Sequence, residues 1–149
     1  MSLATVPLST AVHKAAPLSV GKRRTLVVDD SATILHAICT LLEHHNLVEV
    51  AGRAESGQQA IDGVIELKPE LVLMDADMPG MSGLRTALLL SQMSPQTTVI
   101  LMSMDTSAQF QAACAGCGAF AVIYKPKFLR ELSNLLQRPV RGLGLTAHI

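Results

Sequence analysis

The sequence predicts an α/β fold, a doubly wound parallel sheet of five strands with helices on both faces. Five short apolar runs alternate along the chain with five segments whose apolar residues recur at helical spacing, and this alternation is typical of a parallel sheet. The runs are nearly continuous, as expected of strands that are covered on both faces. With 149 residues, 49% of them hydrophobic, and only three Phe and one Tyr, the chain should form one domain with an aliphatic core.

Each expected strand is a short run of aliphatic residues, several of them β-branched. A strand that is buried on both faces does not need to alternate polar and apolar residues. A continuous apolar run is therefore the pattern that locates such a strand in the sequence. The expected strands cover residues 25–28, 47–51, 71–74, 98–102 and 119–123.

The expected helices lie between these strands, and Ser and Pro mark several of their ends. Ser56, for example, can cap the second helix through its side-chain oxygen. The expected helices cover residues 31–44, 56–67, 82–93, 106 or 107 to about 115, and 127 or 128 to 137. In the third helix, the residues expected to face the core are Leu84, Ala87, Leu88 and Met93.

The two ends of the chain differ from its centre. Residues 1–22 mix Ser, Thr, Ala and Pro without a clear period, which indicates a flexible N-terminal arm. Residues 23–138 form the expected domain, and 139–149 form a short C-terminal tail that is too small for a second domain. We expect a single-domain protein, although the sequence also fits a piece of a longer one.

Composition excludes several classes of function. No apolar run approaches the roughly 20 residues of a membrane span, and the first 20 residues make a poor signal peptide, so we expect a cytoplasmic protein with no membrane partner. Residues 25–124 hold eleven acidic residues against three basic ones, Arg53, Lys68 and Arg85. This acidic middle argues against direct DNA binding.

The three cysteines are Cys39, Cys114 and Cys117, and the last two form a C-x-x-C. An odd count without a secretory signal does not indicate a disulfide framework. A structural zinc site needs four ligands, and the pair falls at the end of an expected helix. We therefore interpret both as small buried residues rather than as a redox or metal site.

Polar residues stand where four of the expected strands end. Asp29 and Asp30 follow the first strand, Asp75 the third and Ser103 the fourth, and Lys125 comes just after the fifth. In parallel sheets ligands bind beyond the carboxyl ends of the strands. Clustered carboxylates suit Mg²⁺, a hydroxyl and a Lys suit a phosphoryl group, and a carboxylate can itself form an aspartyl phosphate.

Each of these residues also has a simpler interpretation. Asp29 and Asp30 could cap the first helix, Ser103 could be an ordinary strand-end hydroxyl, and Lys125 could be a surface charge. Asp77 could be a turn former before Met-Pro-Gly. Their joint occurrence at the ends of four separate strands favours a site.

The motifs resemble the receiver domain of the two-component response-regulator family. They are VVDD at residues 27–30, LVLMDADMPGMSG at 71–83, VILMS at 99–103 and YKPK at 124–127. The resemblance covers about residues 23–137, and it implies the flavodoxin-like strand order 2-1-3-4-5.

The resemblance also implies roles for individual residues. Asp75 would be the phosphoacceptor, and a Mg²⁺ cofactor would be held by Asp29, Asp30, Asp75 and the backbone carbonyl of Asp77. Ser103 would hydrogen-bond a phosphoryl oxygen after transfer. Lys125 would pair with another, and its peptide bond to Pro126 would be cis.

Partners follow from the same resemblance. The phosphoryl group would come from a sensor histidine kinase or a histidine phosphotransfer protein. A downstream output protein would dock on the face made by the fourth helix, fifth strand and fifth helix. Such a protein is not an enzyme beyond its own phosphorylation and dephosphorylation.

Three residues depart from the family pattern. Many members carry an aromatic switch residue three positions before the Lys, where this chain has Val122. The lone Tyr124 directly precedes Lys125 and should point to the opposite side of the strand. Met104 stands after Ser103, where a small residue is usual, and could restrict access to the phosphoryl group.

Two rival functions remain open at this point. One is a receiver-like binding module that is never phosphorylated. The other is a phosphatase of the haloacid-dehalogenase type, which Asp75-Ala76-Asp77 resembles as a D-x-D motif. In those enzymes the D-x-D lies on the first strand, whereas here it follows the third.

Overall fold

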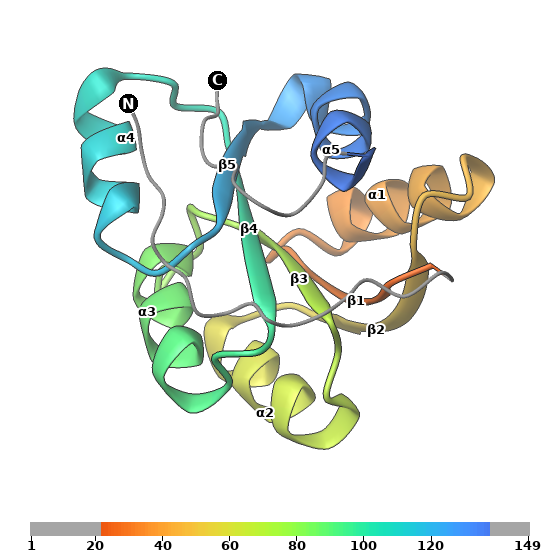
Figure 1. The fold of residues 1–149 in the computed structure, drawn as a ribbon, viewed down its shortest axis with the longest axis horizontal. Coiled ribbons are helices and arrows are strands. Elements are labelled where there is room, and N and C mark those ends of the chain that lie inside the picture. Colours follow the sequence, from red (N-terminus) through yellow and green to blue (C-terminus); the bar gives the residue numbers. More distant parts are fainter. Residues whose placement is uncertain (1–21, 138–149) are drawn as a thin grey trace.

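A computed structural model describes residues 22–137 of the chain (Figure 1). Five parallel strands form one sheet in the order β2-β1-β3-β4-β5, which confirms the predicted fold class and strand order. The strands are β1 (Arg24–Val28), β2 (Glu49–Ala54), β3 (Leu71–Asp75), β4 (Thr98–Ser103) and β5 (Ala121–Tyr124). The helices are α1 (Ala32–His44), α2 (Gly57–Leu67), α3 (Gly83–Met93), α4 (Ala108–Ala115), a 3-10 turn, η2 (Lys125–Lys127), and α5 (Phe128–Gln137).

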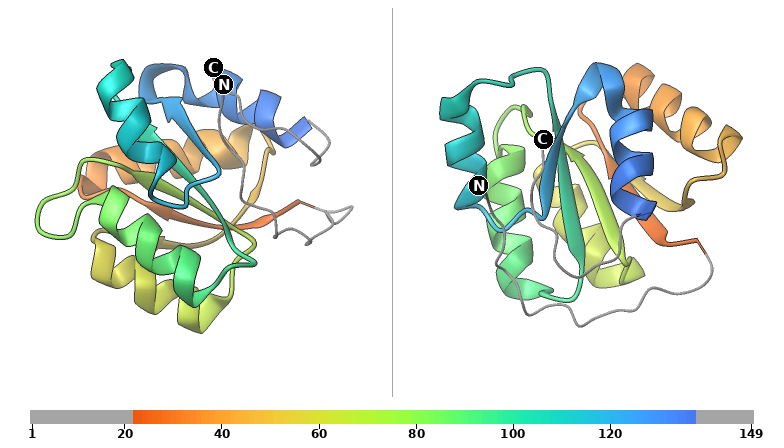
Figure 2. Two further views of the ribbon diagram at one scale, coloured as in Figure 1. Left: turned by 60° about the vertical axis from the view of Figure 1, so that its left-hand side comes forward. Right: turned by 45° about the horizontal axis from the view of Figure 1, so that its top comes forward.

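The helices cover the sheet as two layers, which Figure 2 shows from two sides. One buried apolar cluster joins the strands to α2, α3 and α4, and a second joins them to α1 and α5. Along β1 the residues alternate between the clusters, with Leu26 and Val28 in the first and Val27 in the second. Both faces of each central strand are therefore buried, which explains why the strands read as continuous apolar runs.

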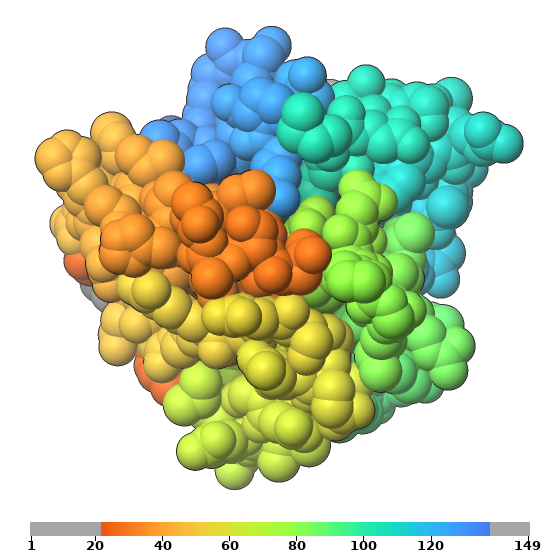
Figure 3. Space-filling view, turned by 180° about the vertical axis from the view of Figure 1, so that it is seen from behind, coloured from red at the N-terminus to blue at the C-terminus, as the bar shows by residue number. Residues whose placement is uncertain are grey.

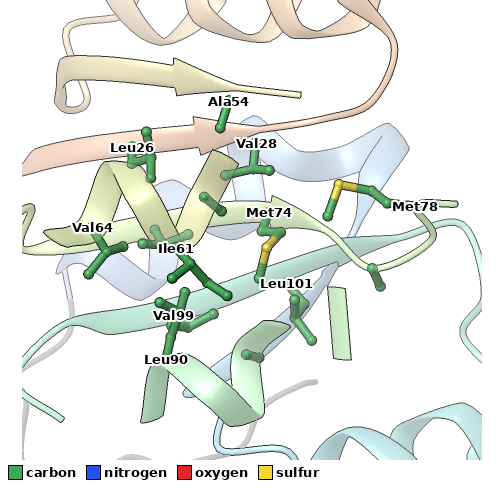
Figure 4. Packing of buried hydrophobic residues seen from close by; sticks show 14 of the residues in the cluster. Leu26, Val28, Ala54, Ile61, Val64, Met74, Met78, Leu90, Val99 and Leu101 are labelled. Atoms are coloured by element: carbon green, nitrogen blue, oxygen red, sulfur yellow. The ribbon is translucent and has the colours of Figure 1, made fainter. Parts of the chain in front are cut away.

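Aliphatic side chains fill the larger cluster, between the sheet and α2 and α3 (Figure 4). Leu26 and Met74 from the strands meet Ile61 of α2 and Leu90 of α3 there. Close packing of this kind fixes how each helix lies on the sheet. It thereby fixes where the loops that leave the strands emerge.

Four helices begin directly after a Ser whose side chain caps the first turn. In each, the hydroxyl oxygen accepts a hydrogen bond from the backbone N–H three residues later, at 3.1 or 3.2 Å. A cap of this kind contributes about 1 kcal/mol to helix stability. The capping residues are Ser31, Ser56, Ser82 and Ser107.

The core face of α3 differs from the prediction. Ala87 is buried and Leu84 is partly buried, as expected, but Leu88 and Met93 are 42% and 47% exposed. Leu90 takes the core position instead and is fully buried. The reason is helical phase, because Leu90 follows Ala87 by three residues and lies on the same face.

Other expectations have mixed outcomes. Cys114 and Cys117 are buried free thiols, as predicted, and Cys39 is also a buried free thiol. Strand β2 starts and ends later than predicted, at Glu49 and Ala54.

In the part of the chain that the structure describes, no helix has the length and apolar character needed to cross a membrane. The arm, apart from Lys22, and the tail at 139–149 lie outside the described residues.

Candidate functional site

The register of the sheet brings the predicted site residues to one edge. Val28 pairs with Met74, Asp75 with Met102, and Ser103 with Tyr124, so β1, β3, β4 and β5 end almost level. In the space-filling view the orange, green, teal and blue segments that follow these strands adjoin one another (Figure 3). The parallel topology thus brings together residues that lie almost a hundred positions apart in the sequence.

Three carboxylates cluster at this edge. Asp29, Asp30 and Asp75 each offer an oxygen, and these oxygens lie within 4.8 Å of one another. Asp29 and Asp75 are buried, at 1% and 6% exposure, while Asp30 is exposed. Asp29 follows β1 directly, and its Oδ1 also accepts a hydrogen bond from the Ser31 N–H at 3.0 Å. This bond orders the turn before α1, whose cap is Ser31 rather than Asp29.

Lys125 supplies the one cation that contacts this cluster within the described residues. Its Nζ lies 2.7 Å from Asp29 Oδ2 and 3.5 Å from Asp75 Oδ2. Burial alone would lower the pKa of Lys125, but Asp29 and Asp75 outweigh it and raise that pKa above the ordinary value. The side chain is therefore held as an ammonium.

Asp75 is placed by the turn that follows β3. Its Oδ1 accepts a hydrogen bond from the Asp77 N–H at 3.1 Å, while Oδ2 is on the side of Lys125. Burial raises the pKa of Asp75, and it outweighs the opposing effects of the Asp77 N–H and of Lys125. A buried carboxylate with one oxygen held by a backbone donor is well oriented for a reaction at the other oxygen.

Gly83 is a residue that the sequence reasoning did not single out. A Cβ at this position would lie 2.3 Å from the backbone oxygen of Asp75 and 2.7 Å from the Cα of Ala76. The Gly83 N–H donates to the Ala76 carbonyl at 3.1 Å. Gly therefore lets the start of α3 contact the end of β3 and holds the backbone of Asp75 in place.

Ser103 ends β4 and is 1% exposed. Its Oγ accepts a hydrogen bond from the Asp105 N–H at 2.9 Å. The Asp105 carboxylate in turn accepts from the Ser107 N–H at 2.8 Å, which ties it to the start of α4. Asp105 was not predicted, because a lone Asp in a loop carries no periodic signal.

The residues that depart from the family pattern occupy distinct places. Met104 is 62% exposed in the loop after Ser103. Val122 is partly buried against the α2–α3–α4 side of the core, and Tyr124 is partly exposed at the end of β5. The side chain of Asp77 is exposed, and the role of its carbonyl stays a prediction.

The predicted cis peptide before Pro126 is wrong. Among the described residues every peptide bond is trans. Pro126 lies in the 3-10 turn Lys125–Lys127, where the Phe128 N–H donates to the Lys125 carbonyl and α5 follows at once. Pro suits the first turn of a helix, since its missing N–H would have no helical partner there.

The donor set fits a hard divalent cation. Asp29 Oδ2 is buried and, apart from its ion pair with Lys125, has no hydrogen-bond donor among the described residues. Three carboxylates against one ammonium leave an excess negative charge. All the candidate donors are oxygens, which Mg²⁺ prefers over the nitrogen and sulfur ligands typical of zinc.

Comparisons with known proteins agree with this geometry. The chain matches the family model of the response regulator receiver domain over residues 25–137. It is 37% identical over 124 residues to a protein-glutamate methylesterase/protein-glutamine glutaminase of Methanococcoides burtonii, covering 80% of this chain and 35% of that protein. A similarly named protein of Geobacter sulfurreducens is 35% identical over 127 residues, covering 82% and 34%. The chain thus spans about a third of the length of these curated relatives.

Solved structures show the same fold. The response regulator domain of Thermotoga maritima CheB matches with a TM-score of 0.65 and 30% identity, over 76% of this chain and 89% of that one. The signal receiver domain of NarL from Mycobacterium tuberculosis matches with a TM-score of 0.70 and 23% identity, over 78% and 98%, and supports the fold alone. With a family match over most of its length, the chain belongs to the response regulator receiver domains of two-component signalling.

Proposed function

We propose that this chain accepts a phosphoryl group on Asp75, in a Mg²⁺-dependent reaction, from a phosphohistidine. The donor would be a sensor histidine kinase or a histidine phosphotransfer protein, met in the cytoplasm. The observation that carries the proposal is the cluster itself: Asp29, Asp30 and Asp75 offer oxygens within 4.8 Å of one another, and Lys125 contacts two of them.

The acidic cluster would hold the metal. Asp29, Asp30 and Asp75 supply carboxylate oxygens, and the backbone carbonyl of Asp77 is a further candidate ligand. When bound, Mg²⁺ neutralises negative charge on the oxygens of the phosphoryl group. The buried Asp29 Oδ2, whose one polar contact among residues 22–137 is Lys125, supports this assignment.

The side chains of the site then have separate tasks. A carboxylate oxygen of Asp75 forms a bond to phosphorus as the bond from phosphorus to the donor imidazole nitrogen breaks, and the imidazole leaves. The Lys125 ammonium, 3.5 Å from Asp75 Oδ2, is close enough to pair with a phosphoryl oxygen. The Ser103 hydroxyl can donate to another phosphoryl oxygen after transfer.

The output partner would dock on the face made by α4, β5 and α5. Residues 106–124 contain no charged residue, and α4 buries only Cys114 against its own core. The part of this face made by α4 and β5 lacks the Lys and Arg that phosphate contacts need, which suits a protein partner, whereas η2 and α5 add Lys127 and Arg130. The names of the relatives support a methylesterase-type output as the first partner to test.

Intact mass spectrometry tests the proposed function. We expect incubation with Mg²⁺ and a small acyl-phosphate donor to raise the mass by one phosphate in the parent and not in Asp75→Ala. Asp62→Ala, which removes an exposed carboxylate on α2, is the matched control and should be labelled like the parent. No labelling of a parent that binds Mg²⁺ would favour an unphosphorylated binding module, and sustained turnover of a phosphomonoester would favour the phosphatase alternative.

A further inference from the structure

The end of β5 is tied to α5 by a side chain that the proposed reaction does not use. The Tyr124 N–H donates to Glu131 Oε1 at 2.9 Å. Tyr124 is the last residue of β5 and directly precedes Lys125, whereas Glu131 lies in the first turn of α5. The hydrogen bond therefore closes a short loop of the chain that contains Lys125, whose ammonium contacts the candidate site.

Strand β5 has few other contacts that could fix its last residue. It lies at the edge of the sheet, with β4 as its one neighbouring strand among the described residues. Of its four residues only Ile123 is buried, whereas all five residues of β3, which carries Asp75, are buried. The backbone of an edge strand lacks a second neighbour. A side-chain acceptor can therefore decide where the end of β5 lies.

Helix α5 provides a firm base for this acceptor. Phe128 and Leu132 are buried in the second apolar cluster, and Glu131, between them in sequence, is partly buried. The Phe128 N–H also donates to the Lys125 carbonyl. The backbone at Lys125 is thus held on both sides, by the bond of Tyr124 before it and by the bond of Phe128 after it.

The contact of Glu131 is with the backbone and not with the Lys125 ammonium. Within residues 22–137, the carboxylates that pair with Lys125 Nζ are those of Asp29 and Asp75. A Lys side chain is a flexible four-carbon stem, so its reach into the site depends on where its backbone is held. We propose that Glu131 is a positioning residue, which holds the end of β5 so that Lys125 reaches the phosphoryl group on Asp75. This inference rests on the proposed phosphorylation of Asp75.

Two variants separate the hydrogen bond of Glu131 from its charge. Glu131→Gln keeps the length of the side chain and an acceptor oxygen but loses the charge. Glu131→Asp keeps the charge but is one methylene shorter, so its oxygen should not reach the Tyr124 N–H. In the metal-free protein, we expect the Tyr124 amide to exchange its hydrogen faster in Glu131→Asp than in the parent or in Glu131→Gln.

Intact mass spectrometry with Mg²⁺ and acetyl phosphate measures the rate at which Asp75 is labelled. We expect labelling to be about tenfold slower in Glu131→Asp, since misplacing a group by about 1 Å can cost up to about a hundredfold in rate. In Glu131→Gln the rate should stay within about threefold of the parent, because a neutral acceptor makes a weaker hydrogen bond. Glu66→Ala, which removes an exposed carboxylate on α2, should be labelled like the parent.

A double variant tests whether Glu131 acts through Lys125. When Lys125 is already replaced in Lys125→Gln, adding Glu131→Asp should slow labelling no further. A general loosening of β5 or α5 would instead slow labelling equally with and without Lys125, and this result would overturn the positioning role. Equal labelling rates in Glu131→Asp and the parent would also overturn it, and it alone. No labelling of the parent would overturn it together with the proposed function.

Discussion

Lys125 Nζ lies closer to Asp29, at 2.7 Å, than to the candidate phosphoacceptor Asp75, at 3.5 Å. The ammonium is thus paired with a carboxylate that is also a candidate metal ligand. Lys125 and a divalent cation are expected to compete electrostatically for the same carboxylates. Lys125 is covalently part of the chain, whereas the cation binds reversibly.

Lys125→Gln is therefore expected to bind Mg²⁺ more tightly than the parent, because a positive charge is removed from beside the metal ligands. A tenfold decrease in Kd corresponds to about 1.4 kcal/mol, and we expect a change of this order. The same variant should be phosphorylated more slowly, since the phosphoryl oxygens lose a cation. Calorimetric titration with Mg²⁺ measures the first effect, and Lys127→Gln, at an exposed Lys two residues away, is the control. Unchanged Mg²⁺ affinity in Lys125→Gln would contradict the competition.

Asp75 and Asp77 are expected to respond very differently to truncation. Asp75 is buried and its Oδ1 is held by the Asp77 N–H, whereas the Asp77 side chain is exposed. Asp75→Ala should abolish phosphorylation, while Asp77→Ala keeps both its N–H and its carbonyl and should change only the rate. Time courses of intact mass with an acyl-phosphate donor measure both. Full loss of labelling in Asp77→Ala would mean that its carboxylate is essential.

Met104 is expected to protect the phosphorylated state. Its side chain is 62% exposed in the loop directly after Ser103. Met104→Ala should shorten the lifetime of the phospho-Asp, because water reaches the phosphoryl group more easily. Met93→Ala removes a similarly exposed Met from the end of α3, at 47% exposure, and should leave the lifetime unchanged. Equal lifetimes of the phospho-Asp in the parent and in Met104→Ala would contradict this prediction.

The pattern of success and failure in the sequence predictions has physical causes. The strand order could be predicted only from the resemblance to receiver domains. The convergence of Asp29, Asp75, Ser103 and Lys125 could be predicted because buried strands read as apolar runs and parallel strands end on one edge. In α3 the leucines at 88–90 are consecutive, so composition alone could not say which one faces the core. The helical spacing from Ala87 selects Leu90, three residues further on, which is fully buried.

Other features depend on the path of the backbone rather than on any periodic pattern. Asp105 acquires its role from the turn that puts its N–H on Ser103 and its carboxylate on Ser107. Gly83 acquires its role from contact between α3 and the end of β3. Pro126 has a trans peptide bond and lies in η2, which continues directly into α5. None of these relationships can be read from spacing.

Gly83→Ala is expected to destabilise the fold and disturb the site together. The added Cβ would lie 2.3 Å from the Asp75 backbone oxygen, so backbone must shift, and overpacking of this kind costs about 1–3 kcal/mol. Gly116→Ala is the matched control, since its Cβ would meet only the Ala113 oxygen at 4.0 Å. Urea unfolding measures both free energies. If Gly83→Ala were as stable as Gly116→Ala, the contact between α3 and β3 would not be as tight as the structure indicates.

The buried thiols are expected to be unreactive in the folded protein. Burial, with a smaller contribution from Cys117, raises the pKa of Cys114 from the ordinary 9.0 to about 12, so at pH 8 the thiol is almost entirely protonated. Burial also raises the pKa values of Cys39 and Cys117. Reaction with a disulfide reagent at pH 8 should therefore be slow in the native protein and rapid for all three thiols in denaturant.

The same shift makes stability depend on pH. Between about 9 and 12 the Cys114 thiol ionises in the unfolded chain but stays protonated in the folded one. The unfolded state thus binds fewer protons in this range, and the free energy of unfolding should fall as the pH rises through it. Cys114→Ala removes this contribution, so urea midpoints measured above pH 9 should decline less steeply in the variant than in the parent. Parallel declines in the two proteins would show that Cys114 ionises alike in both states.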